Sequence, residues 1–135
     1  MSDQPAYACA VIEDARGRLL LELRAPEARR AGDRLTCFGG GREPGESAEQ
    51  ALVRELREEL AWQAPTFAPC CDLRGSDGRW IARFFRCRYD GAAIACEAQV
   101  VPVWAPWPSL PGLPLSPWHA SVLAAVRAGR SEAVA

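Results

Sequence analysis

Short apolar runs separated by turn residues dominate the first third of the chain. Residues 7–12 are almost entirely apolar, and residues 18–23 are apolar except for two charged positions. The turn-forming sequence at 14–17 lies between them, so the pattern predicts two strands joined in a hairpin. Residues 25–34 are polar and rich in Ala and Arg, which is typical of a loop. Residues 35–38 then predict a short strand that runs into three consecutive glycines.

The segment after these glycines has the signals of an amphipathic helix. Ser47 is a favourable N-cap, and Gln50 stands where a capping box places its second side chain. We expect the helix to run to about Leu60. Val53, Leu56 and Leu60 share one apolar arc, which would pack this helix against a sheet.

Strand patterns return in the second half of the chain. Residues 66–73 predict a strand that Pro69 interrupts, and residues 79–89 form the longest strand candidate. After a turn at Asp90 and Gly91, residues 99–104 predict the last strand.

The chain ends in a loop and a second helix. Residues 105–115 are rich in Pro and Trp and predict a loop. Ser116 and Pro117 then supply an N-cap and a proline at the first helical position, so a helix is expected to about Arg127, ended by Gly129. His119 lies at the start of this helix, where we expect a capping or packing role.

The order of elements predicts an α/β (α+β) sandwich, with a mixed β-sheet between the helices at about 47–60 and 117–128. The 135 residues suit a single domain, residues 1–135, with 49% hydrophobic and 24% charged residues. No run reaches the ~18 apolar residues that span a bilayer, and the first residues do not resemble a signal peptide. We therefore expect a cytoplasmic protein.

Charge and residue usage narrow the function further. A net charge of -1 argues against general binding to nucleic acid or to anionic membranes. All 16 basic residues are Arg, which we interpret as the codon bias of a GC-rich, bacterial genome. The six cysteines contain no C-x-x-C pair and the chain has one His, so neither a zinc site nor a redox pair is expected.

Three carboxylates fall on one face of the first predicted helix. Glu55, Glu58 and Glu59 lie within an arc of roughly 100° at helical spacing. Clustered carboxylate oxygens suit a hard cation such as Mg²⁺ or Mn²⁺. On these residues alone the alternative is a solvated acidic face, partly neutralised by Arg54 and Arg57.

The spacing around the helix favours the metal interpretation. The chain reads Gly40, five residues, Glu46, seven residues, and then the sequence RELREELAW at 54–62. This pattern resembles the Nudix box, and the stretch 38–46 is similar to the usual entry of that family. One departure is Ala61, which stands where the box has its second glycine. A glycine there commonly adopts a left-handed conformation, so the exit of the helix is expected to differ.

The resemblance implies a hydrolase that cuts nucleoside diphosphates linked to another group, with Mg²⁺ or Mn²⁺ as cofactor. By position, Glu55 and Glu59 correspond to the principal metal ligands, and Glu58 to an additional ligand or catalytic carboxylate. The carbonyl of Gly39 or Gly40 would complete the coordination shell.

Two further roles follow from the resemblance. Arg54 and Glu46 correspond to a pair that braces the helix against the preceding loop, with Arg54 counted among the catalytic residues. A general base outside the box varies within the family. Glu97 is our candidate for a base or an extra ligand, and an ordinary surface position is the alternative.

Candidate substrate contacts lie on the later strands. Trp80, Phe84, Arg86 and Arg88 alternate along one face of the strand at 79–89, with Trp104 on the next strand. Aromatic rings there would stack a base and Arg side chains would hold phosphate; a solvent-facing surface is the alternative.

The substrate class rests on the small size of the chain and on the lack of a subfamily signature. These favour a MutT-like (d)NTP pyrophosphatase over an ADP-ribose or nucleotide-sugar pyrophosphatase. The alternative from another functional class is a non-catalytic module that senses nucleotides. We expect a small nucleotide as the partner, with no nucleic acid or membrane, and a homodimer stays open.

Overall fold

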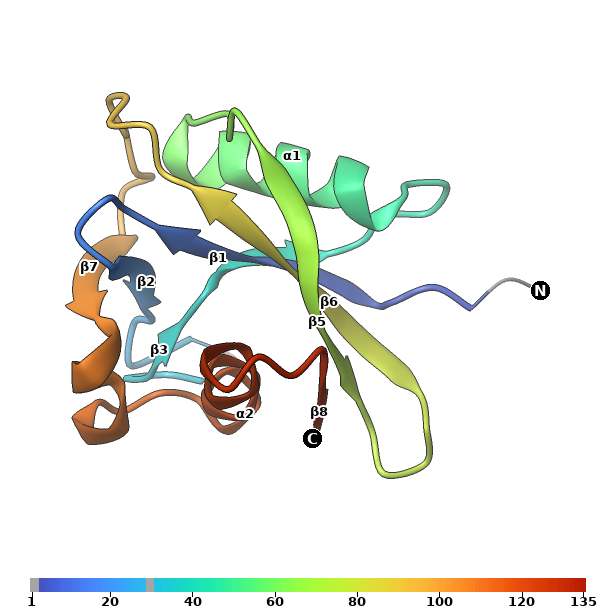
Figure 1. Ribbon diagram of the computed structural model, residues 1–135. Helices are drawn as coiled ribbons and strands as arrows, with labels where there is room; N and C mark the ends of the chain where they lie inside the picture. Colours follow the sequence, from blue (N-terminus) through green and yellow to red (C-terminus); the bar gives the residue numbers. More distant parts are fainter. Residues whose placement is uncertain (1–2, 29–30) are drawn as a thin grey trace.

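The computed structural model describes residues 3–28 and 31–135, so two positions of the predicted 25–34 loop lie outside the described residues. A mixed sheet lies between two helices, as Figure 1 shows. Its strands are β1 (Tyr7–Glu13), β2 (Arg18–Leu23), β3 (Leu35–Thr36), β4 (Phe38–Gly41), β5 (Phe67–Arg74), β6 (Trp80–Arg88), β7 (Val101–Pro106) and β8 (Glu132–Val134). The helices are α1 (Ala48–Leu60), the short 3₁₀ helix η1 (Trp107–Gly112) and α2 (Pro117–Arg127). The predicted fold class is confirmed.

The sheet has β1 and β6 at its centre. Its path is β3-β2-β1-β6-β5-β8, with β4 paired to β1 and β7 paired to β2. The pairs β1–β6 and β5–β8 are parallel, and the remaining strand pairs are antiparallel. Helix α1 covers one face of this sheet and α2 lies on the other (Figure 1).

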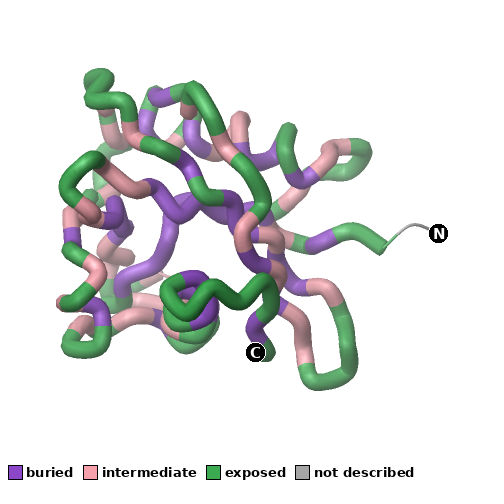
Figure 2. The backbone as a smooth tube through the Cα atoms, viewed as in Figure 1, coloured by how far each residue is buried: buried purple, intermediate pink, exposed green. Residues whose placement is uncertain are grey.

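Both faces of the sheet are buried, which explains the continuous apolar runs of the central strands. Neighbouring Phe84 and Phe85 on β6 are 1% and 0% exposed, because Phe84 packs on the α2 side and Phe85 on the α1 side. The purple, buried backbone in Figure 2 accordingly follows the centre of the sheet. Within the described residues, no helix is long and apolar enough to cross a membrane.

Helix α1 begins at the predicted capping box, whereas the expected change at its exit does not occur. The Gln50 N–H donates to Ser47 Oγ at 3.1 Å, and the Ser47 N–H donates to Gln50 Oε1 at 2.9 Å, which completes the capping box. At the other end Ala61 has φ 50° and ψ 37° and its N–H donates to the carbonyl of Arg57. The left-handed exit is therefore kept without glycine, at a cost of about 1 kcal/mol.

Three parts of the chain differ from the sequence prediction. The expected strand at 35–38 is divided at Cys37, because Thr36 pairs with β2 while Phe38 pairs with β1. The predicted loop at 105–115 contains η1, whose 3₁₀ geometry accommodates its prolines. Strand β8 was not expected, since three residues show no periodicity and pair only with the distant β5.

Candidate active site

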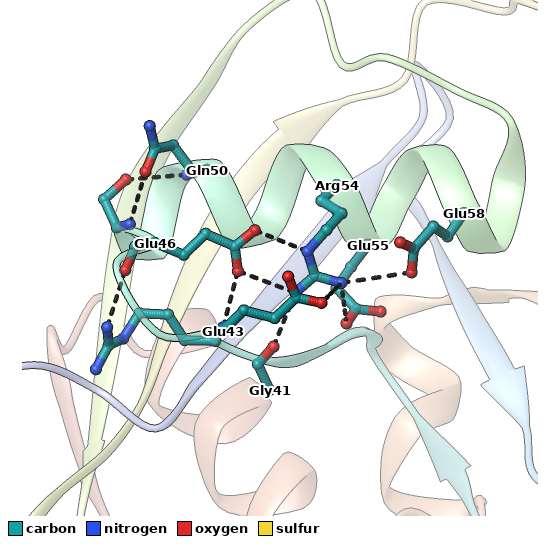
Figure 3. A network of polar contacts seen from close by, with 9 residues as sticks. Gly41, Glu43, Glu46, Gln50, Arg54, Glu55 and Glu58 are labelled. Atoms are coloured by element: carbon teal, nitrogen blue, oxygen red, sulfur yellow. Dashed lines mark hydrogen bonds and ion pairs between the residues drawn. The ribbon is translucent and has the colours of Figure 1, made fainter.

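The guanidinium of Arg54 is the hub of a polar network between α1 and the preceding loop (Figure 3). Its Nε and Nη2 atoms lie 2.7 and 3.0 Å from the two carboxylate oxygens of Glu46, which is a bidentate ion pair. Nη2 also donates to the carbonyl of Gly41 at 2.9 Å, and Nη1 to Glu55 Oε1 at 3.0 Å. One side chain thus joins the glycine-rich strand, the loop and the acidic helix face.

The loop that carries Glu46 is itself held in place. Glu46 Oε1 accepts from the N–H of Glu43 at 2.9 Å, and the Glu46 carbonyl accepts from Arg42 Nη1 at 2.8 Å. The hydrogen bonds from Arg54 lower the pKa of Glu46 to about 2, and those to Glu46 raise the pKa of Arg54. Both partners of the brace are therefore charged at neutral pH.

The glycines of β4 allow the acidic helix face to approach the strand closely. The N–H of Gly39 donates to Glu59 Oε1 at 3.0 Å. A Cβ atom on Gly40 would lie 2.5 Å from Glu55 Oε1, and one on Gly39 would lie 2.3 Å from the Ala8 carbonyl oxygen. Any larger residue at these two positions would displace the carboxylates or the central strand.

Carboxyl groups crowd together where Glu55 and Glu59 meet the glycines, which disfavours their charged forms. Burial, followed by the nearby charge of Glu22, raises the pKa of Glu59 to about 8. Burial also raises the pKa of Glu55, although its hydrogen bond to Arg54 opposes that shift. Glu22 lies on β2 and is 9% exposed, and burial raises its pKa as well. Sequence reasoning missed Glu22; the signal was a carboxylate inside an otherwise apolar strand.

These residues suit a hard divalent cation by their donor chemistry. The Gly40 position is a cradle that a Cβ atom would fill, because the Glu55 carboxylate lies against it, and the Glu59 carboxylate lies next to it on the N–H of Gly39. Across residues 3–28 and 31–135, no three Asp, Glu, His or Cys side chains converge as a ready metal site. Glu55 instead accepts a hydrogen bond from the guanidinium of Arg54, and Glu59 accepts one from the amide of Gly39. Binding a cation would require both carboxylates to turn toward it.

The two other carboxylates predicted for the site have different surroundings. The Glu58 side chain is 54% exposed and lies 3.4 Å from Arg54 Nη1, farther out on the helix than Glu55 at 16%. Glu97 lies in the exposed segment between β6 and β7. Burial is the main cause of the raised pKa of Glu59 and of Glu22, and the charge of Glu97 adds to both shifts.

A cavity of about 720 Å³ opens beside the glycines, on the α2 side of the sheet. Gly39 and Gly40 border it, and aromatic rings of Tyr7, Phe84 and Trp118 line it. Tyr7 and Trp118 form an edge-to-face pair with ring centroids 6.4 Å apart. None of the described lining residues carries a carboxylate, whereas Arg24, Arg34 and His119 bring side chains with N–H groups to its border.

His119 has a defined tautomer in this cavity. The N–H of Cys37, at the break between β3 and β4, donates to His119 Nδ1 at 3.0 Å. The ring proton of the neutral imidazole is therefore on Nε2, which makes that atom a donor. The ring also packs edge-to-face on Phe84 at 5.4 Å. Burial, followed by the charge of Arg24, lowers the pKa of His119 to about 4.

Among the predicted substrate contacts, Phe84 lines this cavity and Trp80 does not. The Trp80 indole N–H donates to Asp72 Oδ1 at 3.0 Å, and the guanidinium of Arg83 lies 4.6 Å from its ring centroid. Arg83 in turn forms a bidentate pair with Asp72 at 2.9 and 3.1 Å. Trp80 is thus held in a polar cluster along β5 and β6.

The other three predicted contacts lie away from the cavity. Arg86 and Arg88 border a second hollow of about 650 Å³, where Arg86 pairs with Glu13 Oε1 at 3.0 Å. Trp104 packs on the α1 side against Tyr89, with ring centroids 5.2 Å apart. Because the strands are covered on both faces, the period of two did not distinguish the cavity face. Sequence reasoning missed Tyr7 and Trp118, which come from opposite ends of the chain.

Comparisons with known proteins agree with this geometry. Residues 3–126 match the family model of the NUDIX domain. A stretch of 56 residues is 50% identical to the CTP pyrophosphohydrolase of Escherichia coli (strain K12), and it spans 41% of this chain and 40% of that protein. The solution structure of the E. coli ORF135 protein is 31% identical, with a TM-score of 0.71 over 93% of this chain and 90% of that chain. The crystal structure of MutT protein from Methanosarcina mazei Go1 is 18% identical and superposes with a TM-score of 0.75 over 95% and 96% of the two chains.

Proposed function

Because the chain belongs to the NUDIX family, we propose that it is a divalent-metal-dependent pyrophosphohydrolase that cuts nucleoside triphosphates to the monophosphate and pyrophosphate. One observation carries this proposal. The Arg54–Glu46 brace holds Glu55 and Glu59 beside Gly39 and Gly40 of β4, which border the aromatic cavity. The acidic cluster and the cavity would then hold the two ends of one nucleotide.

The chain's own residues divide the work of the reaction. Glu55 and Glu59, with Glu58 and a carbonyl of Gly39 or Gly40, would hold Mg²⁺ or Mn²⁺. Such an ion, when bound, neutralises diphosphate charge and lowers the pKa of attacking water. Arg54 fixes the orientation of Glu55 and keeps the helix at its distance from β4, and this fixed geometry contributes to the rate. Glu97 would accept a proton from water or add a ligand.

The cavity supports a nucleoside triphosphate as the substrate. Tyr7, Phe84 and Trp118 offer rings for a base, with the phosphates directed toward Gly39 and Gly40. The Nε2 donor of His119 suits a base edge that carries a carbonyl or ring-nitrogen acceptor. Cytosine has such an edge, and the related E. coli protein is a CTP pyrophosphohydrolase, so CTP and dCTP are the first substrates to test.

A substrate panel tests the proposal. Purified protein is incubated with Mg²⁺ or Mn²⁺ and with single nucleotides, namely the canonical and oxidised (d)NTPs, ADP-ribose, a dinucleoside polyphosphate and NADH, and the products are identified by mass. We expect the highest kcat/KM for a triphosphate and no turnover in EDTA. A higher kcat/KM for ADP-ribose would change the assigned substrate and leave the proposed metal-dependent hydrolysis in place. Tight nucleotide binding without hydrolysis would favour the sensing module instead.

A further inference from the structure

The segment that follows β6 is fastened to the end of α1 by a tryptophan. The left-handed turn at Ala61 directs Trp62 back against the sheet, where it is 3% exposed and packs edge-to-face on Tyr89 at 5.6 Å. Its indole N–H donates to Asp90 Oδ1 at 3.0 Å. The same oxygen accepts from the N–H of Ala92 at 3.0 Å, so one carboxylate joins the helix end to the first turn of the loop.

The rest of the loop also lies along α1. The N–H of Ala95 donates at 2.9 Å to the carbonyl of Leu60, one of the terminal carbonyls that the helix leaves without a partner. Ile94, Cys96 and Val100 pack against the apolar cluster under α1. Backbone hydrogen bonds and side-chain packing therefore hold residues 90–100 in one conformation along α1.

Glu97 follows two residues after Ala95, whose N–H is bound to the carbonyl of Leu60, the neighbour of Glu59, so the backbone at Glu97 runs beside the acidic end of α1. The Val100 N–H donates to the Glu97 carbonyl at 3.1 Å, and Gln99 within this turn has φ 120°. Such a conformation is costly for a residue with a side chain and is kept only where the surroundings impose it. The charge of Glu97 acts on Glu59 and on Glu22, although Glu97 itself is exposed.

We propose that Trp62, through Asp90, is a positioning residue that holds the 90–100 loop so that the Glu97 carboxylate lies at the acidic cluster. The inference rests on the proposed function, because the position of Glu97 matters only if it acts in the hydrolysis. Trp62 would then influence the rate without contacting the substrate, since it lies on the α1 side of the sheet and outside the cavity lining.

Two indole-to-carboxylate hydrogen bonds provide a matched pair of variants. Trp62→Phe removes the N–H and keeps a buried ring against Tyr89. Trp107→Phe removes the equivalent bond from Trp107 Nε1 to Glu13 Oε2, which is 2.9 Å long and involves no residue of α1 or of the 90–100 loop. Hydrogen exchange on the metal-free protein should show faster exchange at Ala92 and Ala95 in Trp62→Phe, by about tenfold or more, and no change there in Trp107→Phe.

Kinetics on the best triphosphate complete the test. Trp62→Phe should lower kcat by about tenfold with KM nearly unchanged, because a misplaced group costs rate rather than substrate binding. Combined with Glu97→Gln, it should add no further loss, whereas independent sites give additive losses. Additive losses, an inert Glu97→Gln or unchanged exchange at Ala92 and Ala95 would overturn the inference. If the unmodified protein cut no nucleotide, the proposed function would fail, and with it the role of Glu97; the exchange data would separately decide whether Trp62 holds the loop.

Discussion

The two faces of the sheet were assembled in different ways. On the α1 side, the acidic cluster and its Arg54 brace come mainly from residues 39–59, so most partners are close along the chain. On the α2 side, the cavity joins Tyr7, Cys37, Phe84 and His119, which come from four separate elements or connections. The first arrangement depends on helical spacing, while the second depends on the whole fold. Substitutions that reshape the cavity can therefore leave the acidic cluster unchanged.

The largest effect is expected when a carboxylate is removed from the α1 side. Glu55→Gln or Glu59→Gln should lower kcat by about 100-fold or more, because a bound cation contributes several kcal/mol to stabilising the transition state. Steady-state kinetics with Mg²⁺ and circular dichroism would measure the loss and the intact fold. Glu49→Gln, an exposed carboxylate in the first turn of the same helix, is the matched control and should retain activity. Full activity of both Glu55→Gln and Glu59→Gln would refute the metal-ligand assignment.

The α2 side should respond to pH through His119. Its pKa is 6.5 when unfolded and about 4 when folded, so the unfolded state binds more protons between these values. Stability from this group is complete above pH 6.5 and falls as the pH drops toward 4, by at most about 3 kcal/mol. Urea unfolding of the wild type and of His119→Gln at pH 7 and pH 5 isolates the contribution. A difference between the two proteins that does not change with pH would contradict it.

A smaller effect concerns the geometry of the brace. Arg54→Lys keeps the positive charge but loses the planar fork that pairs with both Glu46 oxygens, so kcat should fall by about tenfold. Arg57→Lys, on the exposed face of the same helix, should change kcat little. Equal activities of the two variants would show that charge alone, without the fork, supports the site.

The smallest expected effect lies at the helix exit. Ala61→Gly should raise the free energy of unfolding by about 0.5–1 kcal/mol, since glycine adopts φ 50° without strain. Ala128→Gly is the control, because Ala128 ends α2 at φ -85° and glycine there gains nothing. Chemical denaturation would measure both. A loss of stability in Ala61→Gly would mean that the Ala61 methyl group has packing contacts that outweigh its strain.

The sequence predicted the α1 side far better than the α2 side, for a physical reason. The capping pair of Ser47 and Gln50 lies within one turn of α1, so spacing alone predicts it. The Arg54–Glu46 brace follows from the resemblance to the Nudix box, and it joins residues only eight positions apart. The cavity instead depends on the break at Cys37, whose amide reaches a histidine 82 positions away. No periodic pattern records such a contact.

The strand candidates show the same limit. Alternation along residues 79–89 grouped Trp80 with Phe84 as substrate contacts. In the structure Phe84 borders the cavity, whereas the Trp80 indole is hydrogen-bonded to Asp72, and a register shift between β5 and β6 lies beside Trp80. The period of two gives the sides of a strand but not what covers each side.

The most direct test of the central claim is the identity of the products formed from CTP. The wild-type protein and the Glu59→Gln variant are incubated with CTP and Mg²⁺, with and without EDTA. The products are separated and identified by mass spectrometry. We predict CMP and pyrophosphate from the wild type, with loss of both in EDTA and in Glu59→Gln. Release of CDP and phosphate, or equal turnover in EDTA, would contradict a metal-dependent pyrophosphohydrolase built on this acidic cluster.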